Sequence, residues 1–162
     1  LSRINMNLRE TKGWSYGSRS SVRDPLERAQ FYISAPVQAD KTGAAIVELR
    51  KELNGFLSSK GVTGAELERT SNGNVRELPG SFETNDDVLA GMTRIFTYAL
   101  PVDYYETLAG RYQGMTAPAL NNAARAALHP DKLTWLIVGD RKVVEPQLKK
   151  LGLPVEVIPA PQ

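Results

Sequence analysis

The 162 residues of the chain carry 20 basic and 18 acidic side chains, which gives a formal net charge of +2. Because these charges are nearly balanced and interspersed, they give no reason to expect nucleic acid or an anionic membrane as a partner, and no apolar run has the length of a membrane span. A hydrophobic content of 41% excludes a disordered chain, and the lack of cysteine excludes disulfides, thiolate nucleophiles and thiolate metal ligands.

The chain begins with an amphipathic helical segment, followed by two strands. The helical segment is predicted by apolar residues at helical spacing: Leu1, Ile4 and Leu8. Gly13 is a helix-stop glycine, and the alternation of apolar and polar residues over 14–23 and 30–38 predicts strands. Since Asp24-Pro25 supplies a short turn between them, we expect the two strands to pair antiparallel.

The middle of the chain is expected to be helical. The predicted helices are 42–59, a helix beginning at Thr63, one capped by Asn85, one around 103–113 and one capped by Thr116. Glu66 stands three residues after Thr63, which is the spacing of a capping box. The polar stretch 69–76 should be exposed or frayed. The helix after Asn85 is predicted to pack through an apolar stripe: Val88, Leu89, Met92, Ile95 and Phe96.

Two strands and a helix are predicted towards the end of the chain. The β-formers at 133–138 predict a fully buried strand, a helix follows over 141–151, and 155–158 predicts a short last strand. The order helix, two strands, several helices, strand, helix, strand predicts an α+β fold. In such a fold the helices pack on one face of a mostly antiparallel sheet.

The length of the chain is that of one domain. We expect 1–158 to form the C-terminal portion of a single α+β domain and 159–162 to form a tail or linker. Leu1 already lies on the apolar face of a helix, with Ser2 as its only candidate cap. We therefore expect the domain, and any targeting segment, to continue upstream of this chain.

One pair of side chains could carry chemistry at the Gly13 bend. Arg9 lies in the last helical turn and Tyr16 early in the next predicted strand, so the bend brings a fixed cation close to a phenol. Both groups donate hydrogen bonds, and such a pair can hold a peptide carbonyl or a developing oxyanion. The structural alternative is that Arg9 complements the helix dipole and Tyr16 is a favoured strand residue.

Metal binding and serine hydrolysis are not predicted for this chain. A catalytic zinc site needs about three protein ligands, and the chain has a single histidine, His129, which we expect to cap the end of a helix. No loop of clustered oxygen ligands for calcium or magnesium is visible. Ser18, Ser20 and Ser21 lack a histidine as general base, so a serine hydrolase is discarded.

Two further groups of side chains have alternative interpretations. Extra positive charge lies near the Gly13 bend: Lys12, Arg19, Arg23 and Arg28. These side chains are either solvated charges at the edges of strands or a positive patch that attracts acidic substrates. Four tyrosines cluster around Pro101: Tyr98, Tyr104, Tyr105 and Tyr112. Too little basic charge accompanies them for a nucleic-acid stacking platform, so we expect them to pack helix against helix.

Several short motifs follow one another along the chain. They are Ser2-Arg3-Ile4, Leu8-Arg9-Glu10, Gly13-Trp14-Ser15-Tyr16, Thr63-Gly64-Ala65-Glu66-Leu67, Leu100-Pro101-Val102-Asp103-Tyr104-Tyr105, Leu136-Ile137-Val138-Gly139-Asp140 and Leu151-Gly152-Leu153-Pro154-Val155. As an ordered set they resemble the C-terminal half-domain of the pitrilysin/insulinase-type zinc metallopeptidases, the inverzincins. The paired arginine and tyrosine of that family stand seven residues apart, as Arg9 and Tyr16 do.

The resemblance implies the fold of a metallopeptidase half-domain of the pitrilysin/processing-peptidase type, truncated at its N-terminus and lacking the metal motif. It implies that this chain is the substrate-clamping, non-metal part of a zinc-dependent metallopeptidase that hydrolyses peptide bonds in peptides or small proteins. Arg9 would orient the substrate carbonyl, and Tyr16 would donate its O–H to the oxyanion. Glu10 would be a structural partner rather than a base.

The resemblance also implies partners. Zinc is expected in another half-domain or chain that carries the His-x-x-Glu-His helix, and a peptide is expected as substrate, so this chain alone should bind no cofactor and show no activity. The alternative is a non-catalytic structural or scaffold half-domain of a processing-peptidase-like assembly. The cellular location stays open, with a periplasmic or other extracytoplasmic one favoured for a bacterial protein.

Overall fold

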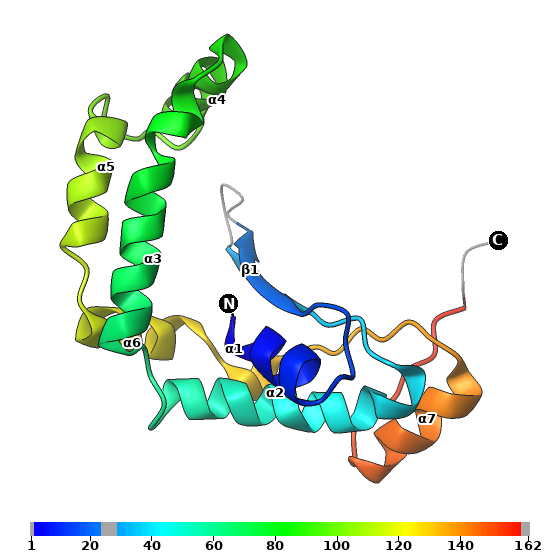
Figure 1. Cartoon of the computed structure of the whole chain (residues 1–162). Coiled ribbons are helices and arrows are strands. Elements are labelled where there is room, and N and C mark those ends of the chain that lie inside the picture. Colours follow the sequence, from blue (N-terminus) through cyan, green and yellow to red (C-terminus); the bar gives the residue numbers. More distant parts are fainter. Residues whose placement is uncertain (1, 24–28, 160–162) are drawn as a thin grey trace. The chain divides into compact units, whose positions relative to one another are not determined.

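The computed structural model describes residues 2–23 and 29–159 (Figure 1). Contacts divide the chain into two compact units, which are considered one at a time. Unit 1 combines Leu1–Arg23, Gln30–Gly55 and His129–Gln162, and unit 2 combines Asp24–Ala29 with Phe56–Leu128. The expectation of a single domain over 1–158 stays a prediction.

Unit 1 combines helices and helical turns with a two-stranded sheet. Its elements are α1 (Arg3–Asn5), the π-helical turn η1 (Met6–Thr11), β1 (Arg19–Arg23), β2 (Gln30–Ser34), the 3-10 turns η2 (Ala39–Lys41) and η4 (Pro130–Lys132), most of α2 (Thr42–Leu57), and α7 (Arg141–Lys150). Ser2 caps α1 by accepting a hydrogen bond from the Asn5 N–H at 3.3 Å. The predicted helical start of the chain is confirmed.

The hydrophobic core of unit 1 has two clusters, and α2 contributes to both. The first joins the N-terminal turns to α2 through Ile4, Leu8, Ala45 and Leu49, and Leu8 is only 1% exposed. The second joins α2 to α7 through Ile46, Val144 and Leu148. The Trp135 side chain packs against both clusters.

A glutamine side chain ties α7 to the start of α2. Gln147 Oε1 accepts a hydrogen bond from the Gly43 N–H at 2.9 Å, and Gln147 Nε2 donates one to the Ala39 carbonyl at 2.8 Å. Gly43 allows this close approach, because a Cβ at that position would lie 3.0 Å from the Gln147 Cβ. Residues 147 and 43 are 104 positions apart, so unit 1 is closed by a contact of very long range.

The sheet of unit 1 is a single antiparallel pair. β1 pairs with β2 in a register that places Arg19 opposite Ser34 and Arg23 opposite Gln30. The antiparallel pairing is confirmed, but the strands are shorter than 14–23 and 30–38, because beyond them only the isolated bridge Ser15–Val37 remains. Tyr16 therefore lies before β1 and not within a strand. The predicted turn at Asp24-Pro25 lies outside the described residues.

The prediction of a fully buried strand at 133–138 is wrong. This segment forms no ladder with another described segment, and its side chains alternate in exposure. Trp135 and Ile137 pack against the core, whereas Leu136 and Val138 are 84% and 94% exposed. A buried strand needs neighbours on both edges, and the described residues supply none. The same holds for the predicted strand at 155–158, where Ile158 is 75% exposed.

Unit 2 is helical. Its elements are α3 (Gly64–Glu77), the 3-10 turn η3 (Pro79–Phe82), α4 (Asn85–Thr97), α5 (Tyr104–Gln113) and α6 (Ala117–Ala127). The helices α3 and α5 lie side by side (Figure 1), and the Ser71 hydroxyl links them by donating to the Tyr112 carbonyl at 2.9 Å. The stretch 69–76, predicted to be exposed or frayed, is helical throughout, and none of its residues is buried.

Hydroxyl side chains cap three helix starts of unit 2, and two of these caps, at α3 and α4, are capping boxes. The predicted box of Thr63 and Glu66 is present at α3, and Thr116 caps α6 as expected. The prediction of Asn85 as a cap is wrong by one residue. Thr84 is the cap of α4, because its hydroxyl accepts from the Asp87 N–H while the Asp87 carboxylate accepts from the Thr84 N–H, both at 3.2 Å.

The predicted inward stripe of α4 is also wrong. Leu89, Met92 and Phe96 are 62%, 63% and 90% exposed, and the buried residue of this helix is Gly91. Gly91 lies against the rings of Phe82 and Tyr105, and a Cβ there would approach the Phe82 ring to 3.0 Å. Because Gly91 has no side chain, α4 packs closely against these rings through Gly91. Its apolar stripe lies away from this contact.

The α+β class and the antiparallel sheet predicted from the sequence are confirmed, with the sheet reduced to two strands in the described part of the chain. Among these residues, no helix combines the length and the hydropathy that crossing a membrane would require.

Candidate functional site

The candidate site lies at the bend between η1 and β1. The Lys12 N–H donates to the Asn7 carbonyl at 3.0 Å, a five-residue spacing that makes this turn π-helical. The Gly13 and Trp14 N–H groups then donate to the Arg9 and Leu8 carbonyls at 3.0 and 2.9 Å. Gly13 has a φ of +65°, the left-handed conformation in which glycine often ends a helix. The helix stop predicted at Gly13 is confirmed.

The bend brings Arg9 and Tyr16 together. The Arg9 Cζ atom lies 5.6 Å from the centre of the Tyr16 ring, within the range of a cation–π contact. Tyr16 is 91% exposed, and the Arg9 side chain is half-exposed. Arg9 Nε also lies 3.4 Å from a Glu10 carboxylate oxygen, which fits the structural role expected for Glu10. A guanidinium and a phenol hydroxyl therefore face solvent at one place.

A network of serines fixes the backbone on both sides of Tyr16. The Ser15 hydroxyl donates to the Pro36 carbonyl at 2.7 Å, and the Ser18 hydroxyl donates to Ser15 Oγ at 3.0 Å. The Ser18 N–H donates to Asn5 Oδ1 at 3.0 Å, and Ser18 is only 5% exposed. Sequence reasoning missed this function, because it considered Ser18 only as a candidate nucleophile and assigned Ser15 no hydrogen bond. The sequence feature that could have indicated this network is the spacing Ser15-x-x-Ser18 around an aromatic residue.

A second polar network holds η1 on α2. Asn7 Nδ2 donates to carboxylate oxygens of Glu48 and Glu52 at 2.9 and 2.8 Å. This hydrogen bond from Asn7, followed by the positive charges of Lys12 and Lys51, holds the pKa of Glu48 below its usual value. Sequence reasoning missed these contacts too, because they join residues more than 40 positions apart.

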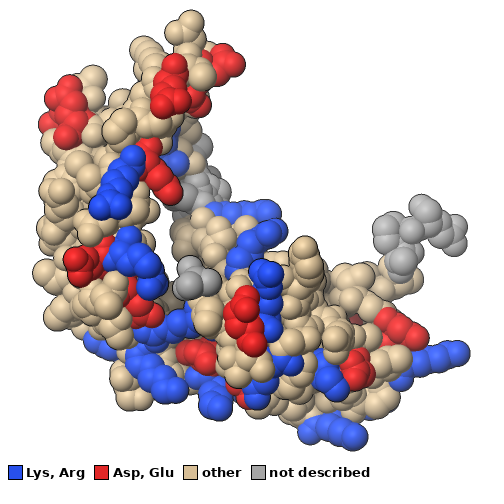
Figure 2. Space-filling model, viewed as in Figure 1, with Lys and Arg blue, Asp and Glu red and all other residues tan. Residues whose placement is uncertain are grey.

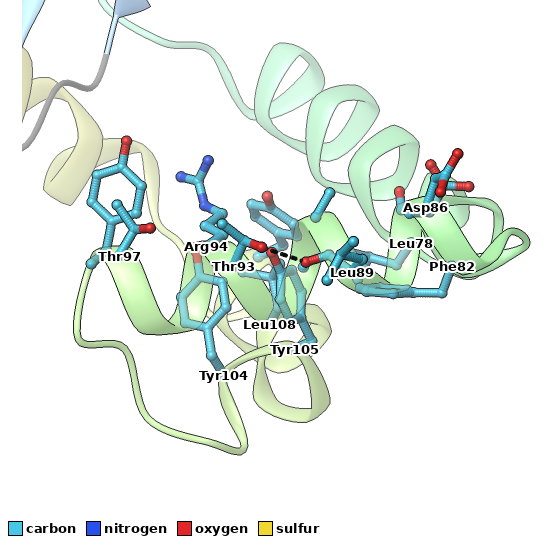
Figure 3. Close-up of a pocket in the computed structure, with 16 residues that line it drawn as sticks. Leu78, Phe82, Asp86, Leu89, Thr93, Arg94, Thr97, Tyr104, Tyr105 and Leu108 are labelled. Atoms are coloured by element: carbon cyan, nitrogen blue, oxygen red, sulfur yellow. Dashed lines mark hydrogen bonds between the residues drawn. The ribbon is translucent and has the colours of Figure 1, made fainter.

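Unit 2 contains a separate open hollow of about 1080 Å³ (Figure 3). Its wall includes the tyrosines near Pro101, with Tyr105 in edge-to-face contact with Phe82 and Tyr104 at 4.9 and 5.0 Å between ring centres. Figure 3 shows Arg94 and Asp86 on opposite sides of Leu89. The contact of Tyr105 with Phe82 joins α5 to η3, whereas Tyr104 and Tyr105 both lie on α5, so the expectation that all four tyrosines pack helix against helix stays a prediction.

The metal-ligating residue types are scattered over the chain. Within 2–23 and 29–159, no group of three or more His, Asp or Glu side chains is placed to hold a metal ion. His129 is exposed and lies between α6 and η4, and the residue at the C-terminal cap of α6 is Leu128, whose N–H donates to the Ala124 carbonyl. The described donor set therefore does not fit a catalytic zinc ion.

Replacing Gly13 tests whether the bend requires its left-handed backbone. No heavy atom lies within 4 Å of the position that a Cβ would take there, so Gly13→Ala introduces strain without a clash. We expect it to lower the free energy of unfolding by about 1–2 kcal/mol, measured by urea denaturation.

Gly73→Ala is the matched control for that substitution. Gly73 lies inside α3, and the position of its added methyl group also has no heavy atom within 4 Å. Because alanine favours helix, this change should raise the free energy of unfolding by about 0.5–1 kcal/mol. Equal effects of the two substitutions would contradict a special backbone requirement at Gly13.

Comparisons with known proteins identify the class of domain that this fold resembles. A family model described as the peptidase M16 inactive domain matches residues 1–74, the part of the chain that holds the Arg9–Tyr16 bend. The chain is thus similar to a peptidase-type domain of the kind that the sequence motifs predicted. Comparison with curated proteins finds no match.

A solved structure extends this similarity over most of the chain. It is the crystal structure of a peptidase M16 inactive domain from Pseudomonas fluorescens, with a TM-score of 0.71 and 26% sequence identity. The match covers 81% of the present chain but only 31% of that protein. The present chain therefore corresponds to about a third of the related protein, and the prediction of a peptidase-like half-domain is confirmed at the level of this similarity.

Proposed function

We propose that this chain is the substrate-clamping, non-metal part of a zinc-dependent metallopeptidase. The observation that carries the proposal is the exposed Arg9–Tyr16 pair, with 5.6 Å between the guanidinium carbon and the ring centre, on the bend inside the matched residues 1–74. The backbone bonds around Gly13 and the serine network hold the backbone of the bend that carries both residues, which supports the proposal. Such pre-organised donors are the kind that stabilise developing charge.

In this proposal each side chain has a defined task. The Arg9 guanidinium holds a backbone carbonyl of the peptide through its planar N–H donors. The Tyr16 hydroxyl donates a hydrogen bond to the carbonyl oxygen of the scissile bond as that oxygen becomes negative. Tyr16 stands between Ser15 and Gly17, which leave room for the backbone of a substrate.

Zinc does not belong to this chain in the proposal. The described donor set offers no metal site, so the metal would be bound by a second half-domain or chain carrying a His-x-x-Glu-His helix. That partner would supply the activated water, and this chain would supply the substrate contacts. A periplasmic or other extracytoplasmic location is proposed for a bacterial protein of this kind.

A scaffold function is the second candidate. The matched family and the related structure are both described as inactive domains, which favours a half-domain that supports an assembly without touching the substrate. The two candidates differ at Tyr16, because a scaffold has no use for an exposed phenol hydroxyl at this position.

If a partner binds the zinc and this chain only contacts the substrate, the isolated chain should be inactive. We expect the purified chain to retain less than stoichiometric zinc after dialysis and to release no product from fluorogenic peptides. Metal content by mass spectrometry and a fluorescence assay measure the two quantities. Stoichiometric zinc together with turnover would show that the chain carries its own metal site, and would contradict the proposal.

A further inference from the structure

The two faces of the β1–β2 hairpin differ in chemistry. Because side chains alternate along a strand, the register places one set of residues on one face: Arg19, Ser21, Arg23, Gln30, Tyr32 and Ser34. We call this set the cationic hairpin face. The opposite face carries Val22, Phe31 and Ile33, and Ile33 packs against the first core cluster. The cationic hairpin face is therefore directed away from that core.

The charge of this face is not neutralised by the described residues. Arg19 and Arg23 are both exposed, and neither guanidinium takes part in an ion pair with a described acidic side chain. The ten residues of β1 and β2 include no Asp or Glu. In Figure 2, Lys and Arg side chains gather over the place where Figure 1 draws β1.

The tyrosine on this face lies in the field of the two guanidinium groups. The Arg23 Cζ atom lies 5.0 Å from the centre of the Tyr32 ring. The pKa of Tyr32 lies below its usual value, first because of a hydrogen bond from Ser21, then because of one from Arg23 and the charges of Arg23 and Arg19. The field at this face thus favours negative charge on an oxygen atom.

We propose that the cationic hairpin face binds an extended acidic peptide segment, whose carboxylates contact Arg19 and Arg23. Arginine recognises a carboxylate through paired, charge-assisted hydrogen bonds. The edge of β1 away from β2 is unpaired among the described residues, and an extended peptide can add to such an edge as a further strand. This inference concerns binding and does not rest on the proposed catalytic role.

The geometry also specifies the spacing of the acidic residues. Arg19 and Arg23 are four positions apart on one strand, which at about 3.3 Å per residue separates their Cα atoms by roughly 13 Å. An extended peptide places its residues i and i+4 on one face at the same separation. Residues i and i+3 point to opposite faces, so a peptide with that spacing can present only one carboxylate to this face.

Labelled nonapeptides test the proposal by fluorescence anisotropy. The first has Glu at positions 3 and 7 in a Ser/Thr background, the second has Glu at positions 3 and 6, and the third has Gln at positions 3 and 7. We expect the first peptide to bind at least threefold more tightly than the second, and the third to lose binding. The double variant Arg19→Gln/Arg23→Gln should weaken binding of the first peptide by about tenfold or more.

The matched control removes two positive charges elsewhere in unit 1. Lys142 and Lys150 are exposed residues of α7, so Lys142→Gln/Lys150→Gln changes the net charge equally and should leave binding within about twofold. Arg19→Lys/Arg23→Lys keeps the charge and should retain part of the affinity. Circular dichroism establishes that each variant is folded.

Three results would overturn the proposal. They are equal affinity for the two Glu peptides, equal loss in the control variant, and no saturable binding up to about 1 mM peptide; the last would identify the arginines as charges that protect a strand edge. The readout here is peptide affinity at Arg19 and Arg23 and not turnover, so a failure of this proposal is distinguishable from a failure of the proposed catalytic role.

Discussion

Tyr16→Phe is expected to lower kcat of the complete enzyme, with its zinc-bearing partner present, by roughly ten- to a thousandfold. The substitution deletes a hydroxyl from a side chain that is 91% exposed, so it removes a donor without opening a cavity. The melting temperature should change little for the same reason. Steady-state kinetics with a peptide substrate and a thermal melt of each variant measure the two effects.

Tyr104→Phe is the control for this prediction, because it removes the same hydroxyl from a tyrosine in the hollow of unit 2. Its kcat should equal that of the unmodified enzyme. Arg9→Lys should weaken substrate positioning as well, since lysine keeps the charge but loses the planar fork of donors. A Tyr16→Phe enzyme with full kcat would contradict the catalytic role of Tyr16 and would favour the scaffold function.

Leu8→Ala is expected to have the largest effect on stability, with a loss of about 2–5 kcal/mol in the free energy of unfolding. Leu8 is 1% exposed and belongs to the cluster that joins the N-terminal turns to α2. Its removal leaves a cavity between elements distant in sequence. Since a domain is stable by only about 5–15 kcal/mol, chemical denaturation should detect the change readily.

Leu136→Ala provides the comparison for this substitution, because Leu136 is 84% exposed. It should change the free energy of unfolding by no more than about 0.5 kcal/mol. If Leu8→Ala cost no more than Leu136→Ala, the first core cluster would not be what holds the N-terminal turns in place.

Features set by neighbouring residues were predictable from the sequence. The Thr63 capping box needs only Glu66, three residues later, and the left-handed glycines at Gly13 and Gly152 follow the ends of helical patterns. The proximity of Arg9 and Tyr16 is of the same kind, because a single tight bend separates them. Their chemical roles stay predictions, which the Tyr16→Phe experiment tests.

Features that depend on distant parts of the chain were not predictable in this way. The segment 133–138 is rich in β-forming residues but forms no strand. A strand needs a neighbouring strand to pair with, and the sequence of the segment itself does not determine whether one is present. The stripe of α4 was assigned to the interior because it is apolar, whereas packing of Gly91 against Phe82 and Tyr105 sets the orientation of this helix. The same limit applies to Asn7, whose partners Glu48 and Glu52 lie on α2.

The Gln147 contact also constrains the order in which the chain can fold during synthesis. Gly43 leaves the ribosome 104 residues before Gln147, and the whole of 56–128 is made in between. The helices of unit 2 have their local partners at once, whereas Ile46 must wait for Val144 and Leu148 to cover it. Closing so long a loop is slow compared with helix formation. Ile46 is therefore an apolar side chain of α2 that stays uncovered by these partners until the last part of the chain has been made.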